Sequence, residues 1–140
     1  MPVPVGRGLF EDFPDSGWDK VMNFDLKSPL FLTQARHGAL KAPVGLERLA
    51  KVINISSING VGLNAGETHS YHASKSALIY LTKRMAARLV RDAINVTSIA
   101  LGALASEMNR AARDHGEAIV KVIPARGLAS TRIWRARRLI

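Results

Sequence analysis

The chain of 140 residues contains no cysteine. Disulfide bonds and thiolate chemistry are therefore excluded, and a reducing compartment such as the cytoplasm is the expected location. Long apolar runs are also missing. The glycine- and proline-bearing start has no apolar core after a basic segment, so it does not predict a signal peptide, and we expect no membrane span or lipid anchor.

Acidic residues are scarce: 11 Asp and Glu stand against 20 Lys and Arg, giving a net charge of +9. Part of this charge comes from residues 127–140, which hold four arginines and no acid. The sequence also lacks a zinc-ligand pattern, an aromatic and basic RNA signature and a helix-turn-helix pattern. We therefore expect nonspecific attraction to phosphate at most, and no specific nucleic-acid partner.

Two short apolar segments flank a helical one. Lys51–Ser57 is a β-branched run that ends in hydroxyls, which predicts a buried parallel strand, and Ile94–Ile99 predicts a second strand. Ser70–Arg91 lies between them and predicts a helix. Its apolar residues recur at helical spacing, as core packing requires; they are Leu78, Leu81, Met85 and Leu89. The three segments together predict a βαβ unit.

The first third of the chain predicts a loop and then one long helix. Met1–Asp15 is interpreted as loop, and Ser16 is expected to cap an amphipathic helix that reaches about Lys41. Pro29 lies inside that helix and predicts a kink or a break. Pro43–Arg48 is interpreted as a linker to the first strand.

Tyr71 and Lys75 carry the strongest chemical signal. Four residues apart on a helix, their side chains lie on the same face, one turn from each other. An ammonium beside a phenol favours the phenolate and suits the phenol to proton transfer near neutral pH. Taken alone, the spacing is more typical of a solvated surface pair.

The order of several motifs resembles the short-chain dehydrogenase/reductase family from about Leu9 to Arg126. The motifs that carry the resemblance are Trp18–Val21, Asn54–Ser57, the Tyr-x-Ala-Ser-Lys pattern of Tyr71–Lys75, and Ile94–Gly102. Bacterial 3-oxoacyl-carrier-protein reductases and sugar or polyol dehydrogenases are the most similar in character.

This resemblance implies hydride transfer between NAD or NADP and the carbon of an alcohol or carbonyl substrate. Tyr71 would exchange the proton of the substrate oxygen, and Ser57 would orient and polarise the carbonyl. Lys75 would favour the phenolate and, with Tyr71, bind the nicotinamide ribose. Gly102 would let the backbone pass close to the nicotinamide, and Ser106 would donate a hydrogen bond to it.

Two residues depart from the family pattern. Asp25 stands where the family often has a catalytic asparagine, and it would bring a negative charge toward a site meant to hold a phenolate. Leu101 stands where the family has a proline before the glycine, which loosens the following loop.

The family's first βα turn, which binds the cofactor pyrophosphate, has no counterpart in this sequence. We therefore expect an incomplete Rossmann-like doubly wound α/β fold, with parallel strands and flanking helices, that lacks the N-terminal nucleotide-binding part. Gly60–Gly66 is interpreted as an active-site loop rather than a phosphate loop. The predicted organisation is a partial catalytic domain over 1–126 and a basic tail over 127–140, which we attribute to a shifted reading frame or a decayed gene.

Other interpretations of the same residues remain open. The alternative to an oxidoreductase is a noncatalytic remnant that at most associates with a full-length relative. A homo-oligomer through the two long helices is also plausible, because that contact would cover apolar surface. No metal site is expected: His69, His72 and Glu67 are more typical of solvated polar surface. Ser57 lacks the glycine-flanked elbow of a hydrolase nucleophile.

Overall fold

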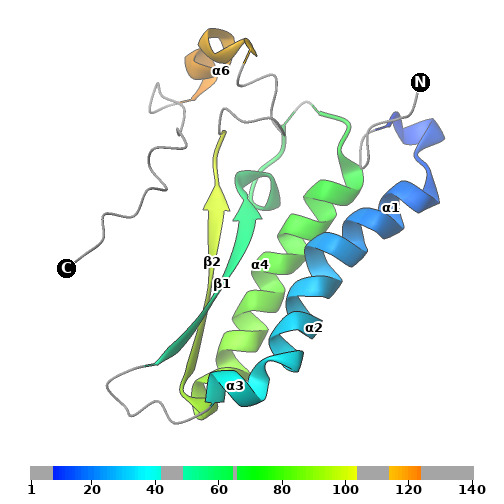
Figure 1. Cartoon of the computed structure of the whole chain (residues 1–140). Coiled ribbons are helices and arrows are strands. Elements are labelled where there is room, and N and C mark those ends of the chain that lie inside the picture. The colour runs from blue at the N-terminus through cyan, green and yellow to red at the C-terminus, as the bar shows by residue number, and fades with distance from the viewer. Residues whose placement is uncertain (1–7, 42–48, 65, 104–113, 124–140) are drawn as a thin grey trace. The chain divides into compact units, whose positions relative to one another are not determined.

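The computed structural model describes residues 8–41, 49–64, 66–103 and 114–123. It divides into a first unit, Met1–Ala100, and a second unit, Leu101–Ile140, and each is described by itself. The first unit is a βαβ arrangement preceded by helices (Figure 1). No helix in the described ranges is long and apolar enough to cross a membrane.

Two parallel strands, β1 (Ala50–Ser57) and β2 (Ile94–Leu101), are paired in a two-stranded sheet. The helix α4 (His69–Leu89) joins them and packs on the sheet. The predicted βαβ unit is confirmed, as is the α/β fold class.

The hydrophobic core lies between α4 and the sheet. Met85, Ile94 and Val96 form its buried cluster, and Leu81 and Leu89 pack against them. Leu78, on the same helix, is buried as well. The helical spacing of apolar residues in α4 was therefore correctly interpreted as core packing.

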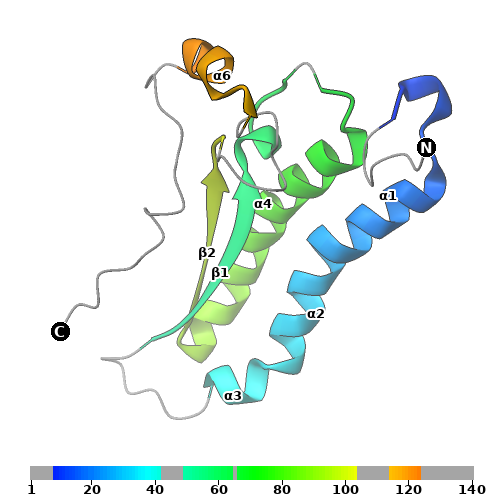
Figure 2. The same ribbon diagram turned by 45° about the horizontal axis from the view of Figure 1, so that its top comes forward.

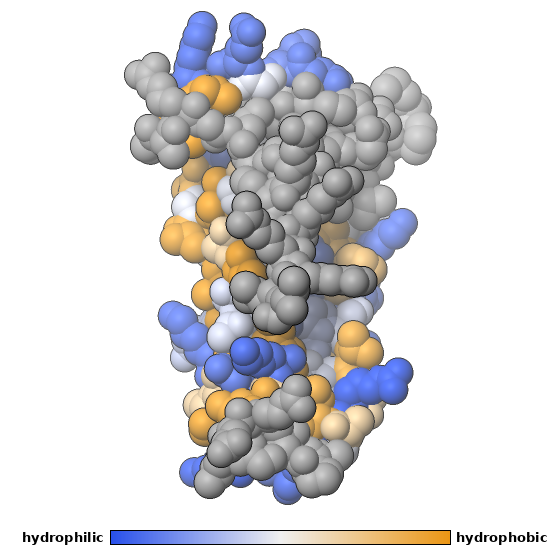
Figure 3. Space-filling view, turned by 60° about the vertical axis from the view of Figure 1, so that its left-hand side comes forward, coloured by the Kyte–Doolittle hydropathy of each residue, from blue (hydrophilic) through white to orange (hydrophobic). Residues whose placement is uncertain are grey.

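The strand β1 departs from its prediction as a buried strand. Ile53 and Ile55 are 54% and 44% exposed, while the polar Asn54 and Ser56 are buried at 7% and 2%. Side chains alternate between the two faces of a strand, and α4 covers the face that carries the polar residues. Hydrophobic residues accordingly form part of the exposed surface of the described chain (Figure 3).

The helices before β1 run along α4 (Figures 1 and 2). They are α1 (Asp15–Met22), a π-helical turn η2 (Asn23–Lys27), α2 (Ser28–Ala35) and α3 (His37–Lys41).

The start of this helical region differs from the prediction. A short 3₁₀ turn, Phe10–Asp12, interrupts the expected loop, and α1 begins at Asp15. Ser16 is therefore not the cap. The carbonyl of Pro14 accepts hydrogen bonds from the N–H groups of Gly17 and Trp18, at 2.9 and 3.1 Å, which places the start of the helix before Ser16.

Pro29 produces a π-helical turn rather than a break. The proline nitrogen has no hydrogen to donate to the carbonyl four residues earlier. The chain adjusts in the preceding turn, where the Ser28 N–H reaches back five residues to the carbonyl of Asn23. The break comes later, at Arg36 between α2 and α3.

The helix α4 ends at Leu89, slightly before the predicted end, and a 3₁₀ turn, Val90–Asp92, follows. Ala93 then takes a left-handed conformation, with φ of 58°, and turns the chain into β2.

The second unit contains the short helix α6 (Gly116–Val122). The expected domain boundary at Arg126 and the basic tail lie outside the described residues.

Candidate functional site

Tyr71 and Lys75 occupy successive turns near the start of α4. The Nζ atom of Lys75 lies 5.5 Å from the centroid of the Tyr71 ring. Lys75 is buried, at 9% exposure, whereas Tyr71 is partly exposed. The cation and the phenol are thus close neighbours on one helix face, as their spacing predicts.

Two oxygens hold the Lys75 ammonium. It donates hydrogen bonds to Oδ1 of Asp25, at 3.2 Å, and to the backbone carbonyl of Ile55, at 3.1 Å. Asp25 comes from the π-helical turn η2 and Ile55 from β1, so the lysine connects three elements. The carboxylate at the family's asparagine position therefore does bring a negative charge to this cluster, through a direct ion pair.

The second carboxylate oxygen of Asp25 faces Ser74. The Ser74 hydroxyl lies 3.3 Å from Asp25 Oδ2 and 2.9 Å from the backbone carbonyl of Tyr71. Ser74 is fully buried. The serine of the Tyr-x-Ala-Ser-Lys pattern therefore helps to attach η2 to α4.

Ser57 is buried at the end of β1. Its hydroxyl accepts a 3.2 Å hydrogen bond from the N–H of Asn59 and makes no hydrogen bond to Tyr71 or Lys75 within the described residues. The turn that follows, η3 (Ile58–Gly60), packs against α4.

Gly60 brings η3 against the helix at Lys75. A Cβ atom on Gly60 would lie 2.6 Å from the Lys75 carbonyl carbon, so only glycine permits this approach. The hydroxyl of Ser76 donates to the Gly60 carbonyl at 2.6 Å. The backbone after Ser57 is thereby held at the turn of α4 that carries Lys75.

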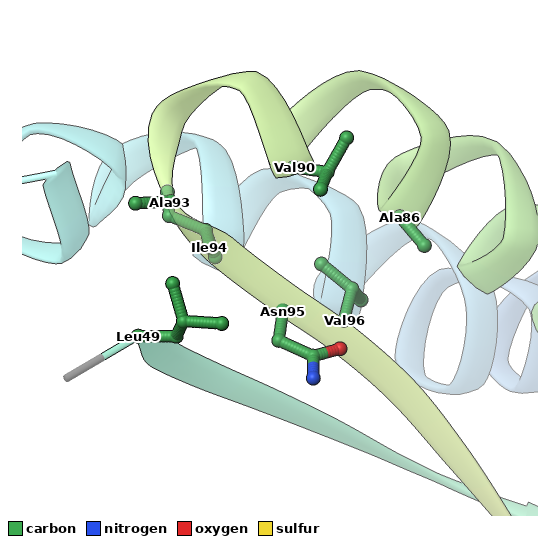
Figure 4. Close-up of a pocket in the computed structure, with 7 residues that line it drawn as sticks. All are labelled: Leu49, Ala86, Val90, Ala93, Ile94, Asn95 and Val96. Atoms are coloured by element: carbon green, nitrogen blue, oxygen red, sulfur yellow. The ribbon is translucent and has the colours of Figure 1, made fainter. Parts of the chain in front are cut away.

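A hollow of about 260 Å³ lies between η3 and the first turns of α4. It is lined by Asn59, Gly60, Val61, Gly62, Leu63, His72, Ala73 and Ser76. A second hollow, of about 220 Å³, lies at the opposite end of α4, where Leu49, Val90 and Ile94 give it an apolar lining (Figure 4). The first hollow is the one beside the Tyr71 and Lys75 segment.

The histidines near the site have partners of their own. His69 pairs with Glu67 at 2.8 Å, and Nδ1 of His72 lies 2.9 Å from both oxygens of Thr68. In the part of the chain that the structure describes, no three acidic, cysteine or histidine side chains are grouped as a metal site requires.

The residue whose pKa is most clearly shifted, Asp92, lies away from this site. The hydrogen bond from His37 lowers the pKa of Asp92 well below its usual range, and Lys41 and Arg88 lower it further against the opposing effect of burial. His37 and Arg88 lie 2.9 Å and Lys41 lies 3.0 Å from the carboxylate. This cluster attaches α3 to the end of α4.

The two remaining candidate residues follow β2. Gly102 comes directly after the strand and has open space around the position of a Cβ. Ser106 lies outside the described residues. Leu101, at the family's proline position, is the last residue of β2.

Two features of the site escaped sequence reasoning. The Ile55 carbonyl gives no sequence signal, since every residue has one. The contacts of Asp25 with Lys75 and Ser74 did have a signal, because Asp25 is one of the two residues that depart from the family pattern.

Comparison with known proteins identifies the relatives of this arrangement. Residues 4–117 match the model of the short chain dehydrogenase family. A rhamnolipid-biosynthesis 3-oxoacyl-[acyl-carrier-protein] reductase of Pseudomonas aeruginosa is 37% identical over 100 residues, which cover 71% of this chain and 39% of that protein.

Two solved structures are also similar to this chain. The Pseudomonas aeruginosa RhlG/NADP active-site complex superimposes with a TM-score of 0.82 at 32% identity, covering 88% of this chain and 49% of the other. A putative 2-deoxy-d-gluconate 3-dehydrogenase from Agrobacterium tumefaciens with bound NADP gives a TM-score of 0.76 at 31% identity, with coverages of 93% and 52%. The chain spans about half the length of these solved structures and less of the reductase. It belongs to the short chain dehydrogenase family.

Proposed function

We propose that this chain carries the proton-transfer part of an oxidoreductase that moves a hydride between NAD or NADP and an alcohol or carbonyl carbon. The observation that carries the proposal is the Lys75 ammonium, buried and held 5.5 Å from the ring of Tyr71. A cation in this position favours the charged form of a phenol, which is what a tyrosine needs to exchange protons with a substrate oxygen.

Each candidate side chain then has a distinct role. The Tyr71 hydroxyl gives a proton to the substrate oxygen, or takes one from it. The Ser57 hydroxyl, at the end of β1, orients that oxygen by a hydrogen bond. Lys75 stabilises the phenolate that Tyr71 becomes when it gives its proton to the substrate oxygen.

The residues present fit the nicotinamide end of the cofactor. The Lys75 ammonium has three N–H groups, and two are used by Asp25 and Ile55, so one can donate to a ribose hydroxyl. Tyr71 is placed beside it, and Gly102 and Ser106 follow β2 as further candidates. When bound, NAD or NADP supplies or accepts the hydride.

The substrate class follows from the relatives only in outline. Several relatives are named 3-oxoacyl-[acyl-carrier-protein] reductases, and another is named a 2-dehydro-3-deoxy-D-gluconate 5-dehydrogenase. These names describe reactions at a carbonyl or an alcohol. Acetoacetyl-coenzyme A is therefore a suitable probe carbonyl.

The test starts with folded protein, checked by circular dichroism. NADPH and NADH are titrated while nicotinamide fluorescence is recorded, first with the parent and then with Lys75→Met. Lys83→Met is the matched control, since Lys83 is exposed on the same helix. A saturable rise in the parent and the control that is lost in Lys75→Met would support the proposal. A flat titration of folded parent protein would contradict it.

The proton-transfer role has its own pair of variants. Tyr71→Phe should still bind the cofactor, more weakly than the parent, because Lys75 remains to donate to the ribose. It should lower the rate of acetoacetyl-coenzyme A reduction by a factor of about 100 or more, which is typical of a missing acid–base group. Tyr80→Phe should change neither cofactor binding nor reduction. Tyr80 is 75% exposed and lies on the opposite side of α4 from Tyr71.

A second candidate function is association through the long helices, as a homo-oligomer or with a full-length relative. Large apolar side chains are exposed on these helices: Phe24, Phe31 and Leu32 before β1 and Tyr80 on α4. An exposed apolar surface of this kind is typical of protein contacts.

Light scattering of the purified chain measures this association directly. Phe24→Gln together with Phe31→Gln should lower the mass toward that of one chain. Val61→Gln is the control, since Val61 is equally exposed but lies outside the helices. A monomeric parent protein would refute self-association.

A further inference from the structure

The ion pair between Asp25 and Lys75 places a negative charge directly on the cation of the site. Asp25 Oδ1 lies 3.2 Å from Lys75 Nζ, closer than the 5.5 Å between Nζ and the centre of the Tyr71 ring. The side chains are only 16% and 11% exposed, so water screens the pair incompletely. Tyr71 therefore has a neutralised pair as its neighbour, not a lone ammonium.

The local backbone explains why Asp25 is there. It lies in the middle of the π-helical turn η2, which Pro29 imposes by lacking an N–H for the carbonyl of Asp25. Both carboxylate oxygens contact α4, one at Lys75 and the other at Ser74. The carboxylate is thus fixed at two points.

Among the described residues, no charged side chain other than Asp25 forms an ion pair with Lys75. The remaining ionisable side chains on α1, η2 and β1, which pack against α4, are all exposed; they are Asp15, Asp19, Lys20, Lys27 and Lys51. On α4 itself, His69 pairs with Glu67, and Nδ1 of His72 lies 2.9 Å from the Thr68 hydroxyl. The other charged side chains of this helix are exposed; they are Lys83, Arg84 and Arg88. The 3₁₀ turn Val90–Asp92 carries Arg91 and Asp92 at the far end of the helix.

We propose that Asp25 is a positioning residue that holds Lys75 and offsets its charge, so that Tyr71 remains a proton donor at neutral pH. The inference rests on the proposed function. In carbonyl reduction the O–H bond of Tyr71 breaks and its proton goes to the substrate oxygen, while a hydride from the reduced nicotinamide reaches the carbon. The carbonyl is reduced, the nicotinamide is oxidised, and Tyr71 is left as phenolate.

The ionisation of Tyr71 can be followed without any cofactor. Tyr71 and Tyr80 are the only tyrosines, so in a Tyr80→Phe background the near-ultraviolet absorbance of tyrosinate reports Tyr71 alone. In that background Asp25→Asn and Asp25→Ala both remove the charge but leave different groups behind. Asp25→Glu retains it.

Removing the charge of Asp25 should lower the pH at which Tyr71 forms its phenolate by about one unit, because the charge of the Lys75 ammonium is then no longer offset. Asp25→Asn and Asp25→Ala should share this shift, and Asp25→Glu should largely restore the parent titration. Asp19→Asn is the matched control, because it removes an exposed carboxylate from α1 and should leave the titration unchanged.

An unchanged titration in both charge-removing variants, or an equal shift in Asp19→Asn, would overturn the proposal. Loss of the native circular dichroism in both Asp25→Asn and Asp25→Ala would overturn it as well, since Asp25 would then serve the fold alone. Because the titration needs no nicotinamide, a failure of cofactor binding would refute the proposed function and leave this result standing.

Discussion

The hydroxyl of Ser56 donates a 2.9 Å hydrogen bond to the backbone carbonyl of Lys75, from the strand β1 to the helix α4. The neighbouring Ser57, by contrast, accepts a hydrogen bond from the N–H of Asn59 in its own turn and makes no other among the described residues. Of the two serines that close β1, one therefore attaches the strand to the helix, and the other is left for the chemistry proposed above.

Ser56→Ala should lower the free energy of unfolding by about 1 kcal/mol, because it removes a buried hydrogen bond without adding bulk. Denaturant unfolding followed by circular dichroism measures the change. Ser16→Ala is the control, since Ser16 is exposed on α1 and its side chain makes no hydrogen bond to the described residues. Equal stabilities of the Ser56 and Ser16 variants would show that the contact with Lys75 does not matter to the fold.

Asn54 and Thr82 form a second buried connection between the strand and the helix. The Asn54 amide donates to the Thr82 hydroxyl at 2.9 Å, and that hydroxyl donates to the Leu78 carbonyl at 2.7 Å. Thr82→Val should cost about 1–3 kcal/mol, because it leaves a buried amide without an acceptor.

A double-mutant cycle tests the same pair. Adding Asn54→Leu to Thr82→Val should recover part of the loss, since no buried polar group is then left unpaired. Thr97→Val, at an exposed position of β2, serves as the matched control. Strictly additive effects of the two changes would argue against a direct interaction.

Gly60→Ala should destabilise the protein by about 1–3 kcal/mol, since its Cβ would collide with the backbone of Lys75 and force η3 away from α4. Gly62→Ala should stay within about 0.5 kcal/mol, because nothing lies within 4 Å of a Cβ there. The two melting temperatures give the comparison. A Gly60 variant as stable as the Gly62 variant would contradict the close approach.

The Asp92 cluster makes a prediction about pH. The pKa of Asp92 is lowered in the folded protein, chiefly by His37, so the carboxylate contributes stability that is present above its unfolded pKa and is lost as the pH falls. That loss begins at roughly pH 4. Unfolding experiments should therefore show a steeper loss of stability in acid for the parent protein than for Asp92→Asn.

The control for this experiment is Asp12→Asn, which changes an exposed carboxylate that no basic side chain contacts in the structure. Its acid dependence should match that of the parent. Parallel acid curves for the parent and Asp92→Asn would mean that the contacts with His37, Lys41 and Arg88 do not stabilise the ionised form.

Sequence periodicity was sufficient for the elements that make up the βαβ unit. Leu78 and Met85 recur at helical spacing and are buried, and the two β-branched runs form parallel strands. These features depend on neighbours in the chain, which a sequence displays directly. The helix start was misplaced by two residues, because the carbonyl of Pro14 and not Ser16 accepts the first helical hydrogen bonds.

The spacing of Tyr71 and Lys75, the order of the motifs and the unusual Asp25 were all determined by the sequence alone. Only the tertiary structure decided that Asp25 binds Lys75, that the Ile55 carbonyl completes its coordination, and that the polar face of β1 is the one covered by α4. The reason is physical: helical and strand periods arise from local geometry, whereas these contacts join residues 20 and 50 positions apart. Such contacts depend on how the elements pack.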